Sequence, residues 1–221
     1  MNTKKYKLAV FDLDGTLLDT RSGILRALEY TIAQNGLPAL PKEKLLTFVG
    51  PQIFNSFRDV FQLSDSEADR IASQFREIYA QDCFLLDAQP YDGIFETLDM
   101  LGRAGIRMGV ATYKRHDCML PLLSYFGFSE YMQGLMFGSD VEHKLTKKDI
   151  IELCIREANI EAPYCVMIGD SLSDGNEAHK LGVDFIGVEY GYGIHYAEDT
   201  FKCPGAIGSV KNSCGLLNII L

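Results

Sequence analysis

The chain of 221 residues has no tryptophan, only four histidines and no apolar run as long as a membrane-spanning helix. Near the start, the apolar run 8–11 is too short for a signal peptide, so we expect neither a secretory leader nor a membrane partner. Internal repeats and low-complexity tracts are also missing. With 47% hydrophobic and 23% charged residues, the composition is typical of a globular protein rather than a disordered or fibrous one.

Basic residues are scarce: 21 Lys and Arg stand against 30 Asp and Glu, which gives a formal net charge of -9. A surface that binds nucleic acid or anionic lipid needs basic patches, so neither is expected as the main partner. An anionic substrate would also be repelled unless a local cation offset the carboxylates. A bound divalent metal is the simplest cation for that purpose.

Paired cysteines at metal-binding spacing are absent, and the histidines do not cluster. This pattern argues against a zinc site and against a disulfide framework. Reduced, mostly buried thiols of a cytoplasmic protein are the expected reading. The six cysteines are Cys83, Cys118, Cys154, Cys165, Cys203 and Cys214.

Two carboxylates follow the first apolar run, residues 8–11, which is suited to a buried parallel strand. Asp12 and Asp14 are two residues apart, so they start out facing the same side, and Gly15 then breaks the strand. Like charges held this close usually bind a cation or divide nucleophilic and acid–base roles. A surface turn or a calcium loop is the open alternative for this pattern.

A second acidic cluster follows another apolar run, residues 165–168. Asp170 and Asp174 supply hard oxygen ligands of the kind that Mg²⁺ prefers. For Asp174 the alternative is helix capping, because Ser173 or Asp174 would cap a helix predicted to run to Leu181.

The spacing of apolar residues divides the chain. From 20 to 84 it is helical throughout, which indicates a small bundle, and from Pro90 it alternates between helix and strand. We therefore predict an α/β fold: a Rossmann-like parallel sheet with helices on both faces, formed by 1–18 and 87–221, and an all-helical domain, 19–86, inserted after the first strand. The later strands are predicted at 107–111, 135–137, 165–168 and 185–188.

The acidic motifs resemble those of the haloacid dehalogenase-like phosphatase superfamily. Residues 11–20, Phe-Asp-Leu-Asp-Gly-Thr-Leu-Leu-Asp-Thr, match its first motif without a gap, and 169–174 match its acidic metal motif. Thr112 and Lys147 stand where the family places a strand-end hydroxyl and a basic residue. Dehalogenases of the superfamily do not keep Asp14, so the resemblance implies phosphoryl chemistry. The helical insertion is similar to the family's cap.

Two further stretches, 48–51 with Gly50 and 187–193, look most like those of phosphoglycolate phosphatase-type members. As a group, such members act on phosphoglycolate, nucleotide 5'-monophosphates, pyrophosphate and sugar phosphates. The resemblance thus implies a small phosphorylated metabolite as substrate, and leaves open which one. Gly50 is a candidate for substrate binding, with a plain turn between cap helices as the alternative.

The resemblance also implies a role for each acid. Asp12 is the nucleophile that forms an aspartyl-phosphate, and Asp14 is the general acid and base. Mg²⁺ is the implied cofactor, with Asp12, the carbonyl of Asp14, Asp170 and Asp174 as ligands, Asp174 either directly or through water.

The negative charge on the transferring phosphoryl oxygens must also be stabilised by hydrogen-bond donors or cations. The resemblance gives this role to Thr112, Lys147 and the backbone N–H groups near Leu13 and Tyr113. Lys144 is the fallback for Lys147.

Two other functions are also consistent with these motifs. A sugar-phosphate mutase or phosphotransferase would use the same aspartyl-phosphate with a sugar hydroxyl in place of water. A phospho-acceptor module of the receiver type also pairs carboxylates with Mg²⁺ on a parallel sheet. A cap domain would move about hinges near residues 19–21 and 86–90. The sequence does not decide between a monomer and a homodimer.

Overall fold

The computed structural model describes residues 6–83, 88–140 and 144–221. The chain forms two compact units: unit 1 is Met1–Leu18 with Pro90–Leu221, and unit 2 is Asp19–Gln89. The predicted boundary between residues 86 and 87 lies outside the described residues, as does part of the predicted hinge 86–90. Within the described ranges, no helix has both the length and the apolar character needed to cross a membrane.

Unit 1 is built on a six-stranded sheet in the order β5-β4-β1-β6-β7-β8, and all neighbouring strands are parallel. This confirms the predicted α/β fold. All four residues of β1 are buried, as expected for a parallel strand covered on both faces. The strands are β1 (Leu8–Phe11), β4 (Arg107–Arg115), β5 (Met136–Ser139), β6 (Cys165–Gly169), β7 (Asp184–Val188) and β8 (Ala206–Val210).

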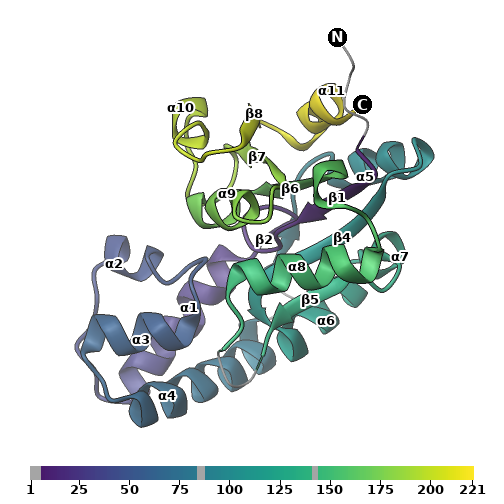
Figure 1. Cartoon of the computed structure of the whole chain (residues 1–221). Helices are drawn as coiled ribbons and strands as arrows, with labels where there is room; N and C mark the ends of the chain where they lie inside the picture. Colours follow the sequence, from purple (N-terminus) through teal and green to yellow (C-terminus); the bar gives the residue numbers. More distant parts are fainter. Residues whose placement is uncertain (1–5, 84–87, 141–143) are drawn as a thin grey trace. The chain divides into compact units, whose positions relative to one another are not determined.

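The helices of unit 1 lie on both faces of this sheet (Figure 1). From β1 the strand order runs one way to β5 and the other way to β8, so right-handed crossovers place the helices of the two halves on opposite faces. Leu8 and Val10 of β1 share one core cluster with residues of α8 and α9. The helices are α5 (Ile94–Arg103), α6 (His116–Tyr125), α7 (Ser129–Met132), α8 (Lys147–Ala158), α9 (Leu172–His179), α10 (Ala197–Thr200) and α11 (Leu217–Ile220).

Some element bounds differ from the sequence prediction. Strand β4 continues four residues past the predicted end at Ala111, because its polar end still pairs with β5, where Arg115 lies opposite Ser139. The edge strand β8 was not predicted. Helix α9 starts at Leu172, two residues before Asp174, where the sequence predicts its start.

The described part of unit 2 is mainly helical, and its core is aromatic. Phe48, Phe57 and Phe75 are buried, with ring centroids 5.4 Å apart for the first two and 6.3 Å apart for the last two. A capping box of Ser64 and Glu67 starts the last helix. The helices are α1 (Arg21–Gln34), α2 (Lys42–Leu46), α3 (Ile53–Phe61) and α4 (Asp65–Ile78), and a π-helical turn (Tyr79–Cys83) follows α4.

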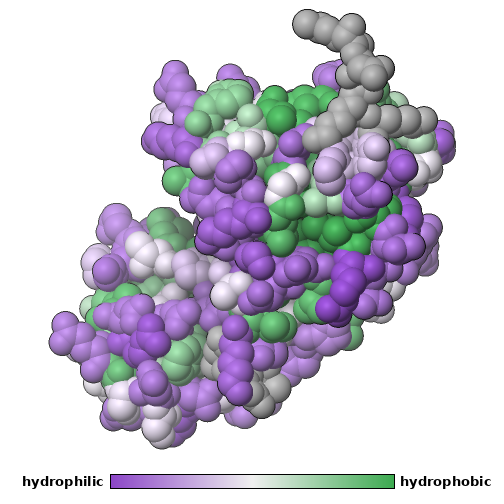
Figure 2. Space-filling view, in the orientation of Figure 1, coloured by the Kyte–Doolittle hydropathy of each residue, from purple (hydrophilic) through white to green (hydrophobic). Residues whose placement is uncertain are grey.

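Two short strands mark where the chain leaves and re-enters unit 1. They are β2 (Leu18–Asp19) and β3 (Gln89–Pro90), and they pair with each other. Figure 2 shows mainly hydrophilic residues on the visible surface, with a region of hydrophobic residues on unit 1.

Candidate active site

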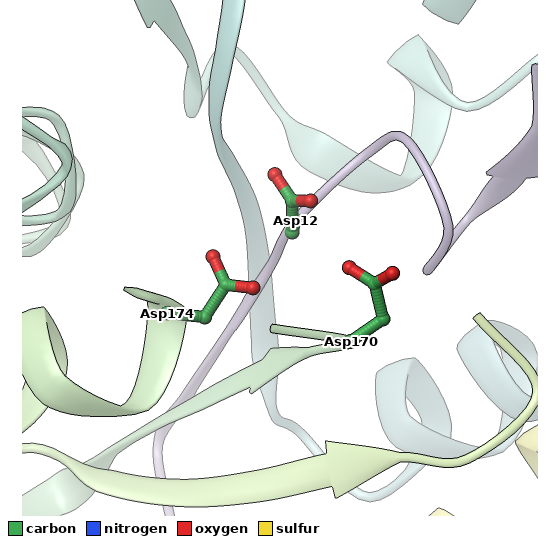
Figure 3. A group of neighbouring side chains, drawn as sticks. All are labelled: Asp12, Asp170 and Asp174. Atoms are coloured by element: carbon green, nitrogen blue, oxygen red, sulfur yellow. The ribbon is translucent and has the colours of Figure 1, made fainter. Parts of the chain in front are cut away.

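Three carboxylates from two distant parts of the sequence meet at the carboxyl edge of the sheet (Figure 3). Asp12 directly follows β1, Asp170 follows β6, and Asp174 lies in the first turn of α9. The two strands are neighbours, and the Asp12 N–H donates to the Ile168 carbonyl at 2.9 Å. Carboxylate oxygens of all three acids lie within 4.8 Å of one another, and all three are buried. The arrangement thus concentrates negative charge in a small, largely dry space.

Asp174 serves two purposes at once, one with each oxygen. Its Oδ2 accepts hydrogen bonds from the Ser171 N–H (3.1 Å) and hydroxyl (2.7 Å), which completes a capping box at the start of α9. Its Oδ1 lies 2.8 Å from the ammonium of Lys147. The predicted cap at Ser173 or Asp174 was therefore misplaced, because Ser171 is the N-cap, and capping does not exclude a role in the site.

Lys147 brings a buried positive charge to these acids. It is the first residue of α8, whose start is fixed by a capping box of Thr146 and Asp149. Its Nζ donates to Asp12 at 2.6 Å and lies 2.8 Å from Asp174, and the side chain is only 2% exposed. Burial disfavours the ammonium ion, but the attraction of the two carboxylates outweighs it and raises the pKa of Lys147. The lysine therefore stays charged.

Burial dominates the ionisation of the acids. It raises the pKa of Asp170 to about 8, helped by the charges of Asp12 and Asp174 and opposed by a 2.6 Å hydrogen bond from the Tyr192 N–H. It also raises the pKa of Asp12 to about 6, although Lys147 pulls in the other direction. Carboxyl groups held at such values are costly to ionise unless a cation joins them.

A divalent cation fits this set of donors. The three clustered acids offer the hard oxygen ligands that Mg²⁺ prefers. By formal charge, the four acids of the site exceed its two ammonium groups by two negative charges, which one divalent cation balances. The acids are Asp12, Asp14, Asp170 and Asp174, and the ammonium groups are those of Lys114 and Lys147.

Asp14 lies apart from the carboxylate cluster, in a tight turn (residues 13–18). The carbonyl of Leu13 accepts the N–H groups of residues 16, 17 and 18, at 3.0 to 3.2 Å. Gly15 has φ +90°, which a side chain would make unfavourable. The Asp14 carboxylate lies 3.1 Å from the Lys114 ammonium, and both side chains are nearly buried. That its carbonyl binds metal stays a prediction.

The end of β4 separates its side chains by strand alternation. Thr112 accepts a hydrogen bond from the Lys114 N–H at 3.1 Å, and Lys114 reaches Asp14. Tyr113 points elsewhere: it packs against the hydrophobic core cluster, and its hydroxyl accepts the Lys147 N–H at 3.0 Å. The sequence left Lys114 open between the rim of a phosphate site and ordinary loop surface, and did not predict its pairing with Asp14. Substrate binding by the Tyr113 backbone stays a prediction.

The remaining candidates lie outside the acidic cluster. The side chain of Leu13 is fully buried, and Gly50 belongs to unit 2, where it has φ +105°. Lys144 is exposed, and Lys148 pairs with Glu152 on the surface of α8 at 3.3 Å. Of the three neighbouring lysines, the structure thus brings Lys147 into the acidic cluster.

Fold and site together define a class: an α/β protein with a cluster of three buried carboxylates and a buried lysine at the carboxyl edge of a parallel sheet. The chain belongs to the haloacid dehalogenase-like hydrolase family, whose model matches residues 9–188. The resemblance seen in the sequence is thereby confirmed.

Relatives with assigned names cover most of the chain. A phosphoglycolate phosphatase of Agrobacterium fabrum is 33% identical over 84% of this chain and 81% of its own length. A 5'-nucleotidase of Pseudomonas aeruginosa is 30% identical over 86% of this chain and 85% of its own. The crystal structure of a predicted phosphatase from Clostridium acetobutylicum superposes with a TM-score of 0.88, at 29% identity over 97% of both chains.

The raised pKa of Asp170 predicts a link between pH, metal and stability. Its folded pKa is about 8 against 3.8 for the free group, so the native protein keeps a proton that the unfolded chain has lost. Without metal, stability should therefore fall as pH rises from 3.8 to about 8. A cation that binds the ionised carboxylate removes this cost. We expect the difference in Tm between protein in Mg²⁺ and protein in EDTA to widen from pH 5.5 to about pH 8.

Asp170→Asn is the control, because an amide carries no charge at any of these pH values. In EDTA its Tm should depend less on pH than that of the wild type over the same interval. A Mg²⁺ effect that is the same at every pH, or is retained in Asp170→Asn, would contradict Asp170 as a metal ligand.

Proposed function

We propose that this protein is a Mg²⁺-dependent phosphomonoester hydrolase that acts on a small phosphorylated metabolite through an aspartyl-phosphate. Its enzyme class, a phosphatase of the haloacid dehalogenase-like family, is supported by the family match and by the named relatives. The observation that carries the proposal is the buried Asp12 carboxylate, held 2.6 Å from Lys147 inside a cluster of three acids.

The reaction has two displacements at phosphorus. An oxygen of Asp12 attacks the phosphorus, the ester P–O bond breaks, and Asp14 gives its proton to the leaving oxygen. Water then attacks the same phosphorus, Asp14 takes up a proton from it, and the bond between phosphorus and Asp12 breaks. Inorganic phosphate leaves, and Asp12 and Asp14 return to their starting states.

The surrounding residues hold charge and position. Mg²⁺, bound by Asp12, Asp170 and Asp174, would offset the negative charge of nucleophile and phosphate. The Lys147 ammonium and the Thr112 hydroxyl stabilise negative charge on the phosphoryl oxygens. Lys114 holds the ionised Asp14 carboxylate in place without substrate, and Asp14 takes up the proton that it later donates when the substrate binds.

Substrate choice is assigned to unit 2, which we propose is the cap domain of this enzyme. The two named relatives differ in substrate, one being a phosphoglycolate phosphatase and the other a 5'-nucleotidase. Phosphoglycolate is our leading candidate, with nucleoside 5'-monophosphates as the alternative. The cytoplasmic location and the oligomeric state stay predictions.

The test is phosphate release from a substrate panel, with Mg²⁺ and with EDTA. The panel holds phosphoglycolate, nucleoside 5'-monophosphates, sugar phosphates, pyrophosphate and p-nitrophenyl phosphate. We expect turnover that requires Mg²⁺, with kcat/KM for the best metabolite within the ordinary enzyme range of about 10⁴ M⁻¹s⁻¹ or above.

Other outcomes would favour the rivals. Phosphoryl exchange between sugar positions, activated by a sugar bisphosphate, would indicate a mutase. A phosphorylated Asp12 that persists for many minutes without turnover would indicate a receiver-type module.

A further inference from the structure

Three tyrosines hold the turn at residues 13–18 from outside. Three successive carbonyls of this turn, those of residues 16–18, each accept a hydrogen bond from a different tyrosine. Tyr190 donates its hydroxyl to the first carbonyl at 3.1 Å, Tyr91 its backbone N–H to the second at 3.2 Å, and Tyr192 its hydroxyl to the third at 3.4 Å. We call these three residues the tyrosine clasp, and all of them belong to unit 1.

The clasp is itself packed. The rings of Tyr91 and Tyr190 lie with their centroids 4.6 Å apart. Burial raises the pKa of Tyr190, so its hydroxyl stays protonated and remains a donor. The clasp donates to main-chain carbonyls of the turn, so it restrains the backbone itself. Rotation of side chains in the turn would not break these hydrogen bonds.

The loop that carries Tyr190 and Tyr192 is anchored on Asp170 at two points. The Tyr192 N–H donates to its carboxylate at 2.6 Å, and the Ile194 N–H donates to its carbonyl at 2.7 Å. Gly191 packs so closely on Asp170 that a Cβ at this position would overlap it. The clasp therefore has a rigid base at the end of β6.

Asp14 lies in the clasped turn, immediately before Gly15, which packs against the Asp170 carboxylate. A general acid must stay within hydrogen-bond reach of the leaving oxygen, and small misplacements are costly. We propose that Tyr190 is a positioning residue for Asp14: its hydroxyl holds the turn so that Asp14 can protonate the leaving group. The kinetic part of this inference rests on the proposed function.

Tyr190→Phe tests it, because the ring that packs on Tyr91 is kept and the donor is lost. We expect kcat/KM for an alkyl phosphate to fall about tenfold, part of the 10²–10⁴ that acid–base catalysis supplies. For p-nitrophenyl phosphate, whose leaving phenolate needs little protonation, the fall should be less than about twofold. kcat/KM is the right parameter, since it reports steps up to leaving-group departure and excludes hydrolysis of the aspartyl-phosphate.

Asp14→Asn and Tyr6→Phe are the matched controls. Asp14→Asn should show the same dependence on the leaving group, and adding Tyr190→Phe to it should cost little more. Tyr6 also donates its hydroxyl within unit 1, to Asp184 at the other end of the sheet. Tyr6→Phe should therefore leave kcat/KM unchanged for both the alkyl phosphate and p-nitrophenyl phosphate. An equal loss with both substrates, an equal loss in the Asp14→Asn background, or no loss at all would overturn the inference.

Amide hydrogen exchange gives a readout that needs no activity. In Tyr190→Phe the N–H groups of residues 15–18 should exchange at least about fivefold faster, which corresponds to losing one hydrogen bond of about 1 kcal/mol. Tyr6→Phe should leave them unchanged. Unchanged exchange at these amides in Tyr190→Phe would overturn the clasp even in an active enzyme. Faster exchange in a protein that hydrolyses nothing on the panel would count against the proposed function alone.

Discussion

Asp12→Asn is expected to abolish Mg²⁺-dependent phosphate release, with a loss of at least about ten-thousand-fold in kcat, as for other enzymes that lose their nucleophile. An amide oxygen is a far weaker nucleophile than a carboxylate, and Lys147 loses one of its two charged partners. The fold should survive, because burial raises the pKa of Asp12 to about 6, so ionising it carries a cost that the neutral amide avoids. Phosphate release on the best panel substrate and the unfolding midpoint are the measurements.

Asp199→Asn is the matched control, since Asp199 lies outside the acidic cluster, in α10, and pairs with Lys202 on the surface. It should keep wild-type activity. In addition, acid quenching of the wild type during turnover should leave phosphate on the peptide that contains Asp12. More than about 1% of wild-type turnover in Asp12→Asn, or phosphate trapped on another residue, would refute the nucleophile assignment.

The acidic motifs were predictable from sequence because each is local. Asp12 and Asp170 both follow short apolar runs, and in a parallel sheet the carboxyl ends of strands meet at one edge. What the sequence did not reveal is the strand order. The two acids are close because β1 lies next to β6, although more than 150 residues separate them in the chain. Pairing of distant strands depends on the whole fold, which no local pattern encodes.

The end of β4 shows where local patterns mislead. The strand was predicted to end at Ala111, with Thr112 just past it, yet β4 runs on to Arg115. Polar side chains in a strand are tolerated here since this end of the sheet borders the site rather than the core. With the strand extended, alternation sends Lys114 to Asp14 and Tyr113 to α8, which a loop would not have done.

Long-range hydrogen bonds to the backbone were out of reach of the sequence. Nothing in the run 187–193 predicts that the Tyr190 hydroxyl meets a carbonyl 174 residues earlier. The start of α9, by contrast, was readable: Ser171 and Asp174 stand at the spacing of a capping box. Capping by Asp174 uses one carboxylate oxygen and leaves the other in the site beside Lys147, so capping does not exclude metal binding, which stays a prediction.

Lys147→Met is the second variant with a large expected effect. Methionine is unbranched and of similar length but lacks the charge, so Asp12 and Asp174 would face each other without a cation between them. Removing one partner from a buried ion pair costs about 3–5 kcal/mol, and the loss of unfolding free energy should be largest in EDTA at high pH. Added Mg²⁺ should restore part of this loss. Activity should fall about a thousandfold even with Mg²⁺, because a donor to the phosphoryl oxygens is gone.

Three further lysine variants test whether the effect of Lys147→Met depends on the place of Lys147 in the site or only on the loss of a positive charge. Lys148→Met removes a half-exposed lysine one residue along α8 and should alter stability by less than about 0.5 kcal/mol and leave activity unchanged. Lys147→Arg keeps the charge but not the compact ammonium, so it should restore stability more than activity. If Lys144→Met lowered activity more than Lys147→Met did, the phosphoryl contact would belong to Lys144. The ion pair of Lys147 with Asp12 and Asp174 would then serve the fold alone.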